Sequence, residues 1–314
     1  MNWRTNLVIF LLVFSACKQE KNAGNNNSGK DAKEMTSSYL IEVDELQNIM
    51  TNDTIKIIDF RKPAVFAKEH IQGAVNIWRT AIENPAYPYK GMMAGKKQLE
   101  DLFSSLGIKT GHTLVIYDDI GLCDAARLWW VLQNYDYTNV RLLHGGISAW
   151  KMAKGAVTNT TAPIKTSHFK LPENPSFNYY ISKGEVLKSI KKKHLLIDTR
   201  TLDEFTGKRH KKGAFKGGRI PTSKWIDWAE AIAYTSTKKL KSKEDLEQIY
   251  GALTSSKNDS IIVYCHSGVR SAHTTFVLTQ LLGYKQVKNY DGSWVEWSHF
   301  KELPFKQDSL TTKF

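Results

Sequence analysis

The chain has 314 residues, a length that suggests about two domains. Of these residues, 41% are hydrophobic and 24% charged, a composition that excludes a wholly disordered or collagen-like protein. No apolar run reaches the ~18 residues of a membrane-spanning helix, and three cysteines are too few for a disulfide scaffold. Lys and Arg number 44 against 31 Asp and Glu, and the resulting charge of +13 suits anionic partners without choosing among them.

The first residues have the pattern of a secretory signal. Arg4 is followed by an apolar run at 7–14 and by two small residues directly before Cys17. A basic start, a short apolar segment and small residues are typical of a signal peptide, which we expect over residues 1–16. The cysteine after the small pair resembles the lipobox of bacterial lipoproteins, although Phe14 stands where Leu is usual. The resemblance implies that Cys17 is lipidated, with palmitate among its acyl chains; the alternative is an ordinary signal peptide.

The next segment is predicted to be a tether. Residues 18–38 contain almost no apolar side chains, so burial cannot offset their ordering entropy, and we expect a flexible segment over 17–38. Two or more acyl chains hold a protein stably on a membrane. We therefore expect a lipid-anchored protein in the cell envelope, outside the cytoplasm, on the periplasmic side or the cell surface.

The rest of the chain contains one pattern twice. Residues 113–118 (TLVIYD) and 260–265 (SIIVYC) are apolar strand candidates, and each is followed by a Gly-containing turn and a helical stretch. Asp118 and Cys265 are 147 residues apart, and the same spacing relates Trp150 to Trp297. An offset held over this length indicates a duplication.

Each half alternates strand candidates with helical segments, which indicates a parallel sheet covered by helices on both faces. We expect strands at 55–59, 113–117, 139–143, 195–198, 260–264 and 286–290, and helices at 98–106, 124–134, 242–252 and 271–282. The predicted fold class is α/β with two such domains. Their predicted bounds are 39–155 for the first domain, 156–177 for a linker, 178–305 for the second domain and 306–314 for a tail.

The turn 265–271 is the predicted site of the chemistry. Ligands of open parallel sheets bind at the carboxyl ends of strands, where Cys265 lies. Backbone N–H groups and the helix dipole at the start of the following helix favour negative charge, so the thiol should have a lowered pKa and be nucleophilic. Gly268 permits the sharp turn and Arg270 adds positive charge. The alternative is a buried, inert cysteine.

The remaining residues of this predicted active-site loop are His266, Ser267, Val269 and Ser271. Cysteine-dependent phosphatases use a similar loop, but theirs has five residues between Cys and Arg. Here there are four, and a smaller ring of amides suits the terminal sulfur of a persulfide better than a phosphate. No Asp is evidently placed as a general acid for a leaving hydroxyl.

These motifs together resemble the tandem-domain rhodanese family, the thiosulfate and 3-mercaptopyruvate sulfurtransferases. The resemblance covers about residues 39–305 and rests on IDTR (197–200), GGRIP (217–221), YCHSGVRSA (264–272), YDGSWVEW (290–297), EHIQGAVNI (69–77) and YDDIGLCDAARLWW (117–130). It implies two rhodanese-like domains, of which only the second carries the active cysteine. The first copy has Asp118 at the position that corresponds to Cys265. This agrees with an inactive first domain, because a carboxylate cannot accept sulfur.

The resemblance implies a covalent ping-pong reaction at Cys265. The thiolate takes the outer sulfur of a donor, and the resulting persulfide passes it to cyanide or a thiol, with no metal and no organic cofactor. Enzymes of the mercaptopyruvate type have an Asp where this chain has Lys90, and an Arg where it has Glu204. These departures favour thiosulfate as donor over 3-mercaptopyruvate, with a persulfide or polysulfide relay as a further alternative.

A basic insertion supports a small anionic donor. The segment 206–217 leaves the end of a predicted strand and is absent from the first half. We expect its Lys208, Arg209 and Lys212, with Arg219 and Arg270, to attract and bind the donor. The alternatives are a solvated basic loop or one that faces anionic lipid. Because these cations lack interleaved aromatic residues, we expect no nucleic-acid partner.

Three further expectations complete the prediction. Cys123 aligns with Arg270 and not with Cys265, so we expect a small core or loop residue and no disulfide between the two cysteines. We expect a monomer. A non-enzymatic alternative is a docking or sulfur-sensing module of the envelope, in which Cys265 would be unreactive.

Overall fold

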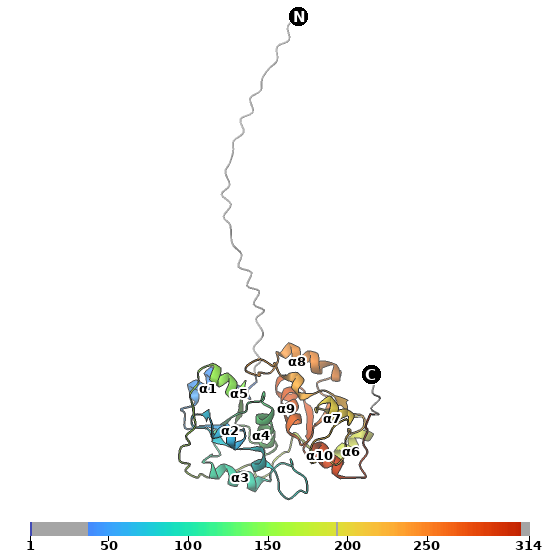
Figure 1. Ribbon diagram of the computed structural model, residues 1–314, viewed down its shortest axis with the longest axis horizontal. Coiled ribbons are helices and arrows are strands. Elements are labelled where there is room, and N and C mark those ends of the chain that lie inside the picture. The colour runs from blue at the N-terminus through green and yellow to red at the C-terminus, as the bar shows by residue number, and fades with distance from the viewer. Residues whose placement is uncertain (2–36, 193, 309–314) are drawn as a thin grey trace. The chain divides into compact units, whose positions relative to one another are not determined.

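The computed structural model describes residues 1, 37–192 and 194–308 (Figure 1). The predicted signal peptide, Cys17, nearly all of the predicted tether and residues 309–314 lie outside the described residues. Within the described part, every helix is too short or too polar to cross a bilayer.

The first half builds one five-stranded sheet in the order β1-β6-β5-β2-β4, and all of its strand pairs are parallel. Its elements are β1 (Leu40–Ile41), α1 (Val43–Ile49), β2 (Ile55–Asp59), α2 (Pro63–Phe66), β3 (His70–Ile71), β4 (Val75–Asn76), η1 (Arg79–Ile82), α3 (Lys96–Ser105), β5 (Thr113–Tyr117), α4 (Cys123–Asn134), β6 (Val140–Leu143), α5 (Gly146–Met152) and β7 (Val157–Thr158). β3 and β7 form a separate antiparallel pair.

The second half builds a second parallel sheet in the order β8-β12-β11-β9-β10. Its elements are β8 (Tyr180–Ile181), α6 (Lys183–Lys191), β9 (Leu195–Asp198), α7 (Leu202–Thr206), β10 (Lys224–Trp225), η2 (Trp228–Ala231), α8 (Lys243–Tyr250), η3 (Gly251–Leu253), β11 (Ser260–Tyr264), α9 (Val269–Phe276), η4 (Val277–Leu281), β12 (Gln286–Tyr290) and α10 (Ser293–His299). Matched by sequence position, the two sheets have the same strand order, so the predicted α/β class with two duplicated sheets is confirmed.

Helices cover both faces of each sheet because alternate strand residues point to opposite sides. In the first half, Ile57 belongs to the cluster that contains α1 and α5, whereas Ile58 belongs to the cluster that contains α3 and α4. In the second half, Ile262 packs with α6 and α10, and Ile261 packs with α8 and α9. Near-continuous apolar strands of this kind are typical of parallel sheets that are buried on both faces.

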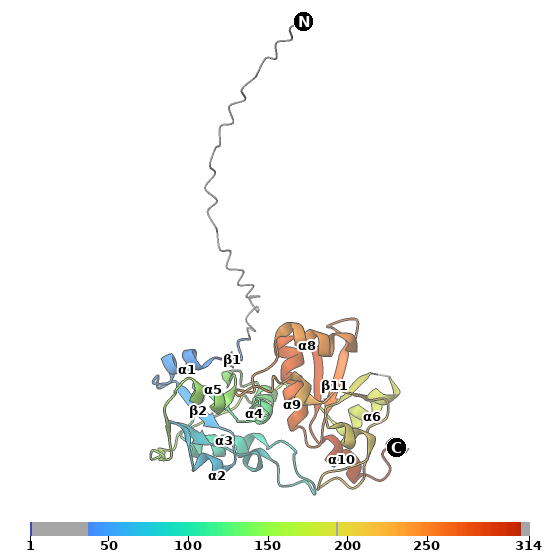
Figure 2. The same cartoon turned by 45° about the horizontal axis from the view of Figure 1, so that its top comes forward.

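The two halves share one core, because α4 and α9 pack against each other. These helices lie side by side in both views (Figures 1 and 2). The Trp129 and Phe276 rings meet edge to face with centroids 5.0 Å apart. Beside them, the buried Arg127 guanidinium of the first half donates to the Asp291 carboxylate of the second, at 2.6 Å. Burial of both charges as a pair ties the first half to the segment that follows β12.

The predicted helix 271–282 begins earlier and ends differently. α9 begins at Val269 and changes at Val277 into a π-helical turn, η4. The hydroxyls of Thr275 and Thr279 donate to the carbonyls of Ser271 and Thr275, at 2.8 and 2.7 Å. Such bonds compete with the regular backbone ladder, and π-turns of this kind are frequent near functional sites.

Each half is also locked by a buried Asp–Arg pair at the end of its second strand. Arg200 Nε donates to Asp198 at 2.9 Å, and Arg200 Nη2 donates to the Gly218 carbonyl at 2.7 Å. Arg61 bonds Asp59 and the Glu69 carbonyl in the same way. The duplicated IDxR-type sequences therefore have a structural role: each holds the next loop against the carboxyl edge of its sheet.

His273 of α9 provides a test of the shared core. Its ring is fully buried, lies edge to face with Trp228 at 5.3 Å, and has a pKa lowered to about 4 by burial. The unfolded chain binds a proton at a pKa of about 6.5. The folded state therefore binds fewer protons at this residue, so the free energy of unfolding should fall as pH drops from about 6.5 towards 4.

The His273→Leu variant should lack this pH-dependent loss. Between pH 7.5 and 4.5, the unfolding free energy of the wild type should fall by about 2 kcal/mol more than that of the variant. Urea unfolding at the two pH values measures the difference. An equal fall in both proteins would contradict the assignment.

Candidate active site

Cys265 follows β11 at the carboxyl edge of the second sheet, directly before the turn into α9. The residue is 1% exposed. Gly268 has φ +75°, and a Cβ there would lie 2.7 Å from the Asp291 carbonyl oxygen, so glycine is required at this point of the turn. The turn thus brings a thiol and a helix start together in a tightly packed setting.

A second segment holds the outer side of the turn. The Ser293 hydroxyl accepts hydrogen bonds from the amides of Cys265 and Gly268, both at 3.1 Å, and donates to the Tyr290 carbonyl at 2.7 Å. Asn289 donates to the Gly268 carbonyl at 3.1 Å. With these peptide groups occupied from outside, the remaining amides of the turn are free to face the sulfur.

Those amides stabilise a thiolate. Burial alone would raise the pKa of the Cys265 thiol, but Arg270, the Ser271 hydroxyl and the backbone N–H groups of Ser271 and Ser267 outweigh it. The pKa of Cys265 consequently lies below the ordinary value for a thiol. The site therefore favours the thiolate more than the surroundings of an ordinary cysteine do.

The first half contains the same arrangement of amides around the carboxyl group of Asp118, whose pKa burial raises. The buried Asp118 carboxylate accepts from the amides of Ile120, Leu122, Asp124 and Ala125, at 3.1, 2.9, 2.8 and 3.1 Å. Ile120 and Asp124 correspond to Ser267 and Ser271 at the offset of 147. The loop therefore gathers amides at one point in both halves, and only in the second half does that point hold a nucleophile.

Arg270 is held in place by a partner that sequence reasoning missed. Its two terminal nitrogens donate to the Glu204 carboxylate at 2.7 and 2.9 Å, in a buried bidentate pair. Despite burial, Arg270 lowers the pKa of Glu204 to about 2, so the carboxylate stays charged. Each terminal nitrogen keeps a second N–H group, so the pair with Glu204 fixes the guanidinium, and binding of the donor by Arg270 stays a prediction.

One protein-family model matches both halves of the chain. The model of the rhodanese-like domain matches residues 42–153 and 182–300. The chain belongs to the rhodanese-like family. Relatives include the SseA protein of Mycobacterium leprae, which is 37% identical over 75% of this chain and 79% of its own.

Two further relatives and a solved structure agree with this membership. The thiosulfate sulfurtransferase of Corynebacterium glutamicum is 32% identical over 77% of this chain and 81% of its own. The sulfur carrier protein TtuD of Thermus thermophilus is 31% identical over 84% and 95%. The anaerobic ergothioneine biosynthesis enzyme of Chlorobium limicola has the same fold, with a TM-score of 0.75 at 20% identity over 86% of this chain and 70% of its own.

The Lys and Arg side chains in and beside the basic insertion 206–217 of this rhodanese have different surroundings. Partial desolvation and Arg270 lower the pKa of Lys211 while the Cys265 thiolate opposes the shift, so Lys211 lies within electrostatic reach of the nucleophile although its side chain is exposed to solvent. Lys208 and Arg209 are exposed. Arg219 instead pairs with Asp308 at 2.6 Å and stacks on Phe205, so its contacts do not support the expectation that it binds substrate.

The other residues singled out from the sequence have defined settings. The His266 ring bonds the Lys212 carbonyl through Nε2 at 3.2 Å, and burial lowers its pKa to about 4, so it is neutral near pH 7. Cys123 is buried, and burial raises the pKa of its thiol well above the ordinary value. Both described cysteines are free thiols, as expected, and Cys123 has the character of an inert core residue.

The first half also reaches the active-site loop. A Cβ at Gly91 would lie 2.6 Å from Ser267 Cβ, so only glycine permits this close approach of the two halves. Lys90 and Ser267 line one cavity. The stretch that aligns with the Asp-bearing segment of mercaptopyruvate-type enzymes thus lies beside the loop, with a lysine in place of the carboxylate.

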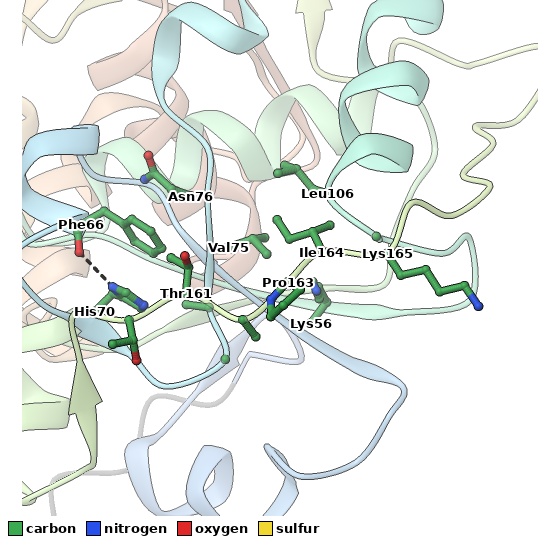
Figure 3. A pocket seen from close by; sticks show the side chains of 15 residues that line it. Lys56, Phe66, His70, Val75, Asn76, Leu106, Thr161, Pro163, Ile164 and Lys165 are labelled. Carbon is green, nitrogen blue, oxygen red and sulfur yellow. Dashed lines mark hydrogen bonds between the residues drawn. The ribbon is translucent and has the colours of Figure 1, made fainter.

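A separate hollow of about 350 Å³ lies in the first half, under the segment 160–165 (Figure 3). His70 bonds the Phe66 carbonyl on one side of it, and Lys56 lies on another. No cysteine is among the described residues that line it. This hollow is distinct from the active-site loop.

The Ser271→Ala variant tests the origin of the low thiol pKa. Loss of one neutral hydrogen bond to the thiolate should raise the pKa of Cys265 by about one unit. The pH profile of alkylation by iodoacetamide should shift upwards accordingly, with a roughly tenfold lower rate at a pH below both pKa values. Thr279→Ala, which removes a hydroxyl further along the chain, serves as control. An unshifted profile in Ser271→Ala would show that the hydroxyl does not act on the sulfur.

Proposed function

We propose that this rhodanese is a sulfurtransferase that moves the sulfane sulfur of thiosulfate to a thiophilic acceptor through a persulfide on Cys265. The observation that carries the proposal is the convergence of Arg270, the Ser271 hydroxyl and two loop amides on a buried thiol whose pKa they lower. Membership of the rhodanese-like family and the names of the relatives support the same reaction.

The first half-reaction follows from this geometry. The Cys265 thiolate attacks the outer sulfur of thiosulfate, the new sulfur–sulfur bond forms, and the old one breaks. Its electron pair leaves with sulfite. The persulfide anion that remains on Cys265 keeps one negative charge at the focus of the loop amides, so the cradle that stabilises the thiolate also stabilises the intermediate.

The second half-reaction returns the enzyme to its starting state. Cyanide or a thiolate attacks the outer sulfur of the persulfide, and Cys265 leaves as the thiolate that the loop stabilises. A low thiol pKa makes Cys265 a good leaving group here, just as it makes the nucleophile available in the first step. No proton transfer to Cys265 is needed in either direction.

The positive charge of Lys211 near Cys265 favours a dianionic sulfur donor. Arg270 is compensated by Glu204, whereas Lys211 has no carboxylate within ion-pair distance among the described residues. A cation near the nucleophile favours the sulfonate end of thiosulfate and, after cleavage, the leaving sulfite.

The Cys265→Ser variant tests the reaction. Wild type should form thiocyanate from thiosulfate and cyanide, and intact-mass measurement after thiosulfate alone should show a gain of one sulfur atom. Cys265→Ser should show neither, whereas Cys123→Ser, which changes the other described thiol, should still gain the sulfur. A wild-type protein that gains no sulfur from any donor would refute the proposal. Pyruvate release from 3-mercaptopyruvate at a higher kcat/KM than sulfite release from thiosulfate would reassign the donor.

We also propose that the enzyme is held on a membrane through lipid on Cys17, in the cell envelope. The support is the sequence pattern of a basic start, an apolar run and small residues directly before this cysteine. Anchoring through residue 17 would leave the segment up to β1 as a tether between the membrane and the catalytic unit.

Metabolic labelling with an alkynyl palmitate tests the anchor. The wild type and Cys123→Ala should both carry the label, and Cys17→Ala should not. Mass spectrometry of the N-terminal peptide should find residue 17 as the modified first residue. An unlabelled wild type whose N-terminus is unmodified would indicate an ordinary secreted protein.

A further inference from the structure

A cavity of about 360 Å³ lies between the first half and the start of the second. Four of the residues that line it are aromatic, namely Tyr87, Tyr135, Phe177 and Tyr180. The other lining residues are Asn84, Met92, Met93, Gly95 and Asp291. Among the described residues, none of the catalytic loop 265–271 lines this cavity. It is therefore a second hollow, which the reaction at Cys265 leaves unexplained.

Three of the aromatic rings stand at angles to one another. The Tyr135 and Phe177 centroids are 5.4 Å apart with their planes inclined by 65°. The Phe177 and Tyr180 centroids are 6.2 Å apart with the same inclination. Rings inclined in this way point their faces in different directions, so a rounded group between them meets more than one π-face. The fourth ring, Tyr87, is 42% exposed and borders the opening.

The walls of the cavity are held in place before any ligand arrives. The Tyr135 hydroxyl donates to the Ala94 carbonyl at 2.8 Å. Phe177 has φ +49°, a left-handed conformation that residues other than glycine rarely adopt, and its amide donates to the Asn134 carbonyl at 3.2 Å. A strained backbone of this kind persists only where the surrounding structure holds it, and it is frequent at ligand sites. Preformed walls lower the entropy cost of binding.

The cavity has negative charge beside it and no cation in its described wall. Asp291 is the only charged residue among the described lining residues, and it forms a buried pair with Arg127. Glu296 is 7% exposed, accepts from the Tyr89 hydroxyl at 2.9 Å and has no ion-pair partner in the described part of the chain. Burial, and then the charges of Asp291 and Glu296, raise the pKa of Tyr180, so both carboxylates act on this ring. A ligand cation would meet a favourable potential here.

The hydrogen-bonding groups of the wall select the kind of cation. The Asp291 carboxylate already accepts from Arg127 and from the Met93 amide, at 2.6 and 2.8 Å. The Asn84 side-chain oxygen accepts from the Ala86 amide at 3.0 Å. A primary ammonium is strongly hydrated and needs acceptors for its three N–H groups. A quaternary ammonium has no N–H group, and its methyl groups pack directly on aromatic faces.

We propose that the cavity lined by Tyr87, Tyr135, Phe177 and Tyr180 binds a quaternary ammonium group, such as the trimethylammonium group of choline. The methyl groups lie against the ring faces, and the two nearby carboxylates balance the charge. The cavity of about 360 Å³ is within the range of roughly 300–1,000 Å³ that is usual for small-molecule sites. This site goes beyond the proposed sulfur transfer and does not depend on it, because no residue of the catalytic loop takes part.

Choline and its neutral isostere test the role of charge. In 3,3-dimethylbutan-1-ol a carbon atom replaces the nitrogen, so the shape is kept and the charge is lost. Isothermal titration calorimetry should show that the wild type binds choline about tenfold more tightly than the isostere, a difference of about 1.4 kcal/mol. Ethanolamine, a primary ammonium with the same chain, should bind more weakly than choline. Equal affinities for choline and the isostere, or no heat with choline, would overturn the inference.

Two ring variants locate the site. Tyr87→Leu and Tyr180→Leu keep an apolar side chain but remove a π-face. Each should weaken choline binding by about tenfold and change the binding of the isostere by less than about twofold. Tyr180→Phe, which keeps the ring, should bind choline as the wild type does. Tyr87→Leu changes an exposed side chain, so it decides the question even if Tyr180→Leu does not fold.

Free choline and phosphatidylcholine headgroups carry the same trimethylammonium group. Sedimentation with phosphatidylcholine vesicles distinguishes the two sources, with Cys17→Ala protein so that the proposed anchor is absent. Release of the protein from the vesicles by free choline, lost in the Tyr87→Leu variant, would assign the headgroup. Protein that stays in the supernatant while it binds choline would assign a free solute.

Matched controls separate this site from general effects. Tyr234 is 70% exposed and does not line the cavity, so Tyr234→Leu should bind choline as the wild type does. Cys265→Ser should also bind choline unchanged, whether or not the wild type gains sulfur from thiosulfate. Loss of choline binding in Tyr234→Leu would indicate nonspecific contact, and loss in Cys265→Ser would place choline at the catalytic loop. Either result contradicts the assignment without bearing on the proposed sulfur transfer.

Discussion

The active site depends on peptide N–H groups that converge on one negatively charged atom at the end of a parallel strand. A buried sulfur would ordinarily be a poor anion, because burial disfavours charge. Here the amides of Ser267 and Ser271, the Ser271 hydroxyl and the charge of Arg270 outweigh that cost. The surrounding contacts make this possible: Ser293 and Asn289 hold the outer peptide groups of the turn, and Glu204 fixes the guanidinium.

The duplicated half serves as an internal comparison for this electrostatic arrangement. Its loop bonds Asp118 through four amides, so the backbone geometry directs N–H donors at whichever side chain stands at this position. The same fold is thus inert in one copy and nucleophilic in the other. The first copy still contributes to the site, since Gly91 lies against the loop of the second half and Lys90 and Tyr89 line a cavity together with it.

The sequence was informative where the physical signal is local. The central strands are long apolar runs, and the structure has β2, β5, β9, β11 and β12 within a residue of their expected bounds. The repeat offset alone predicts that Cys265 stands at the end of β11, without any family resemblance. The two-residue edge strands β1, β8 and β10 have no such run, since they are defined by pairing with neighbours far along the chain.

Side-chain pairs between residues far apart in the chain could not be predicted from the sequence. Glu204 stands 66 residues before Arg270, and only the fold shows that the two form a bidentate pair. Within the insertion, we expected Lys208, Arg209 and Lys212 to bind the donor, yet Lys211, which that expectation left out, lies within electrostatic reach of Cys265. Arg219 lies just beyond it and is turned towards Asp308. The π-turn at Val277–Leu281 and the threonine bonds beside it are likewise features that a count of apolar spacing does not register.

The contact between α4 and α9 has an evolutionary consequence. The two helices occupy equivalent positions in the two repeats, so each packs against its own counterpart. A face that fits its own copy is the signature of a twofold homodimer. An ancestral single-repeat protein with this face would have paired with itself. In the duplicated chain, the covalent connection between the repeats holds these two faces together without an association step.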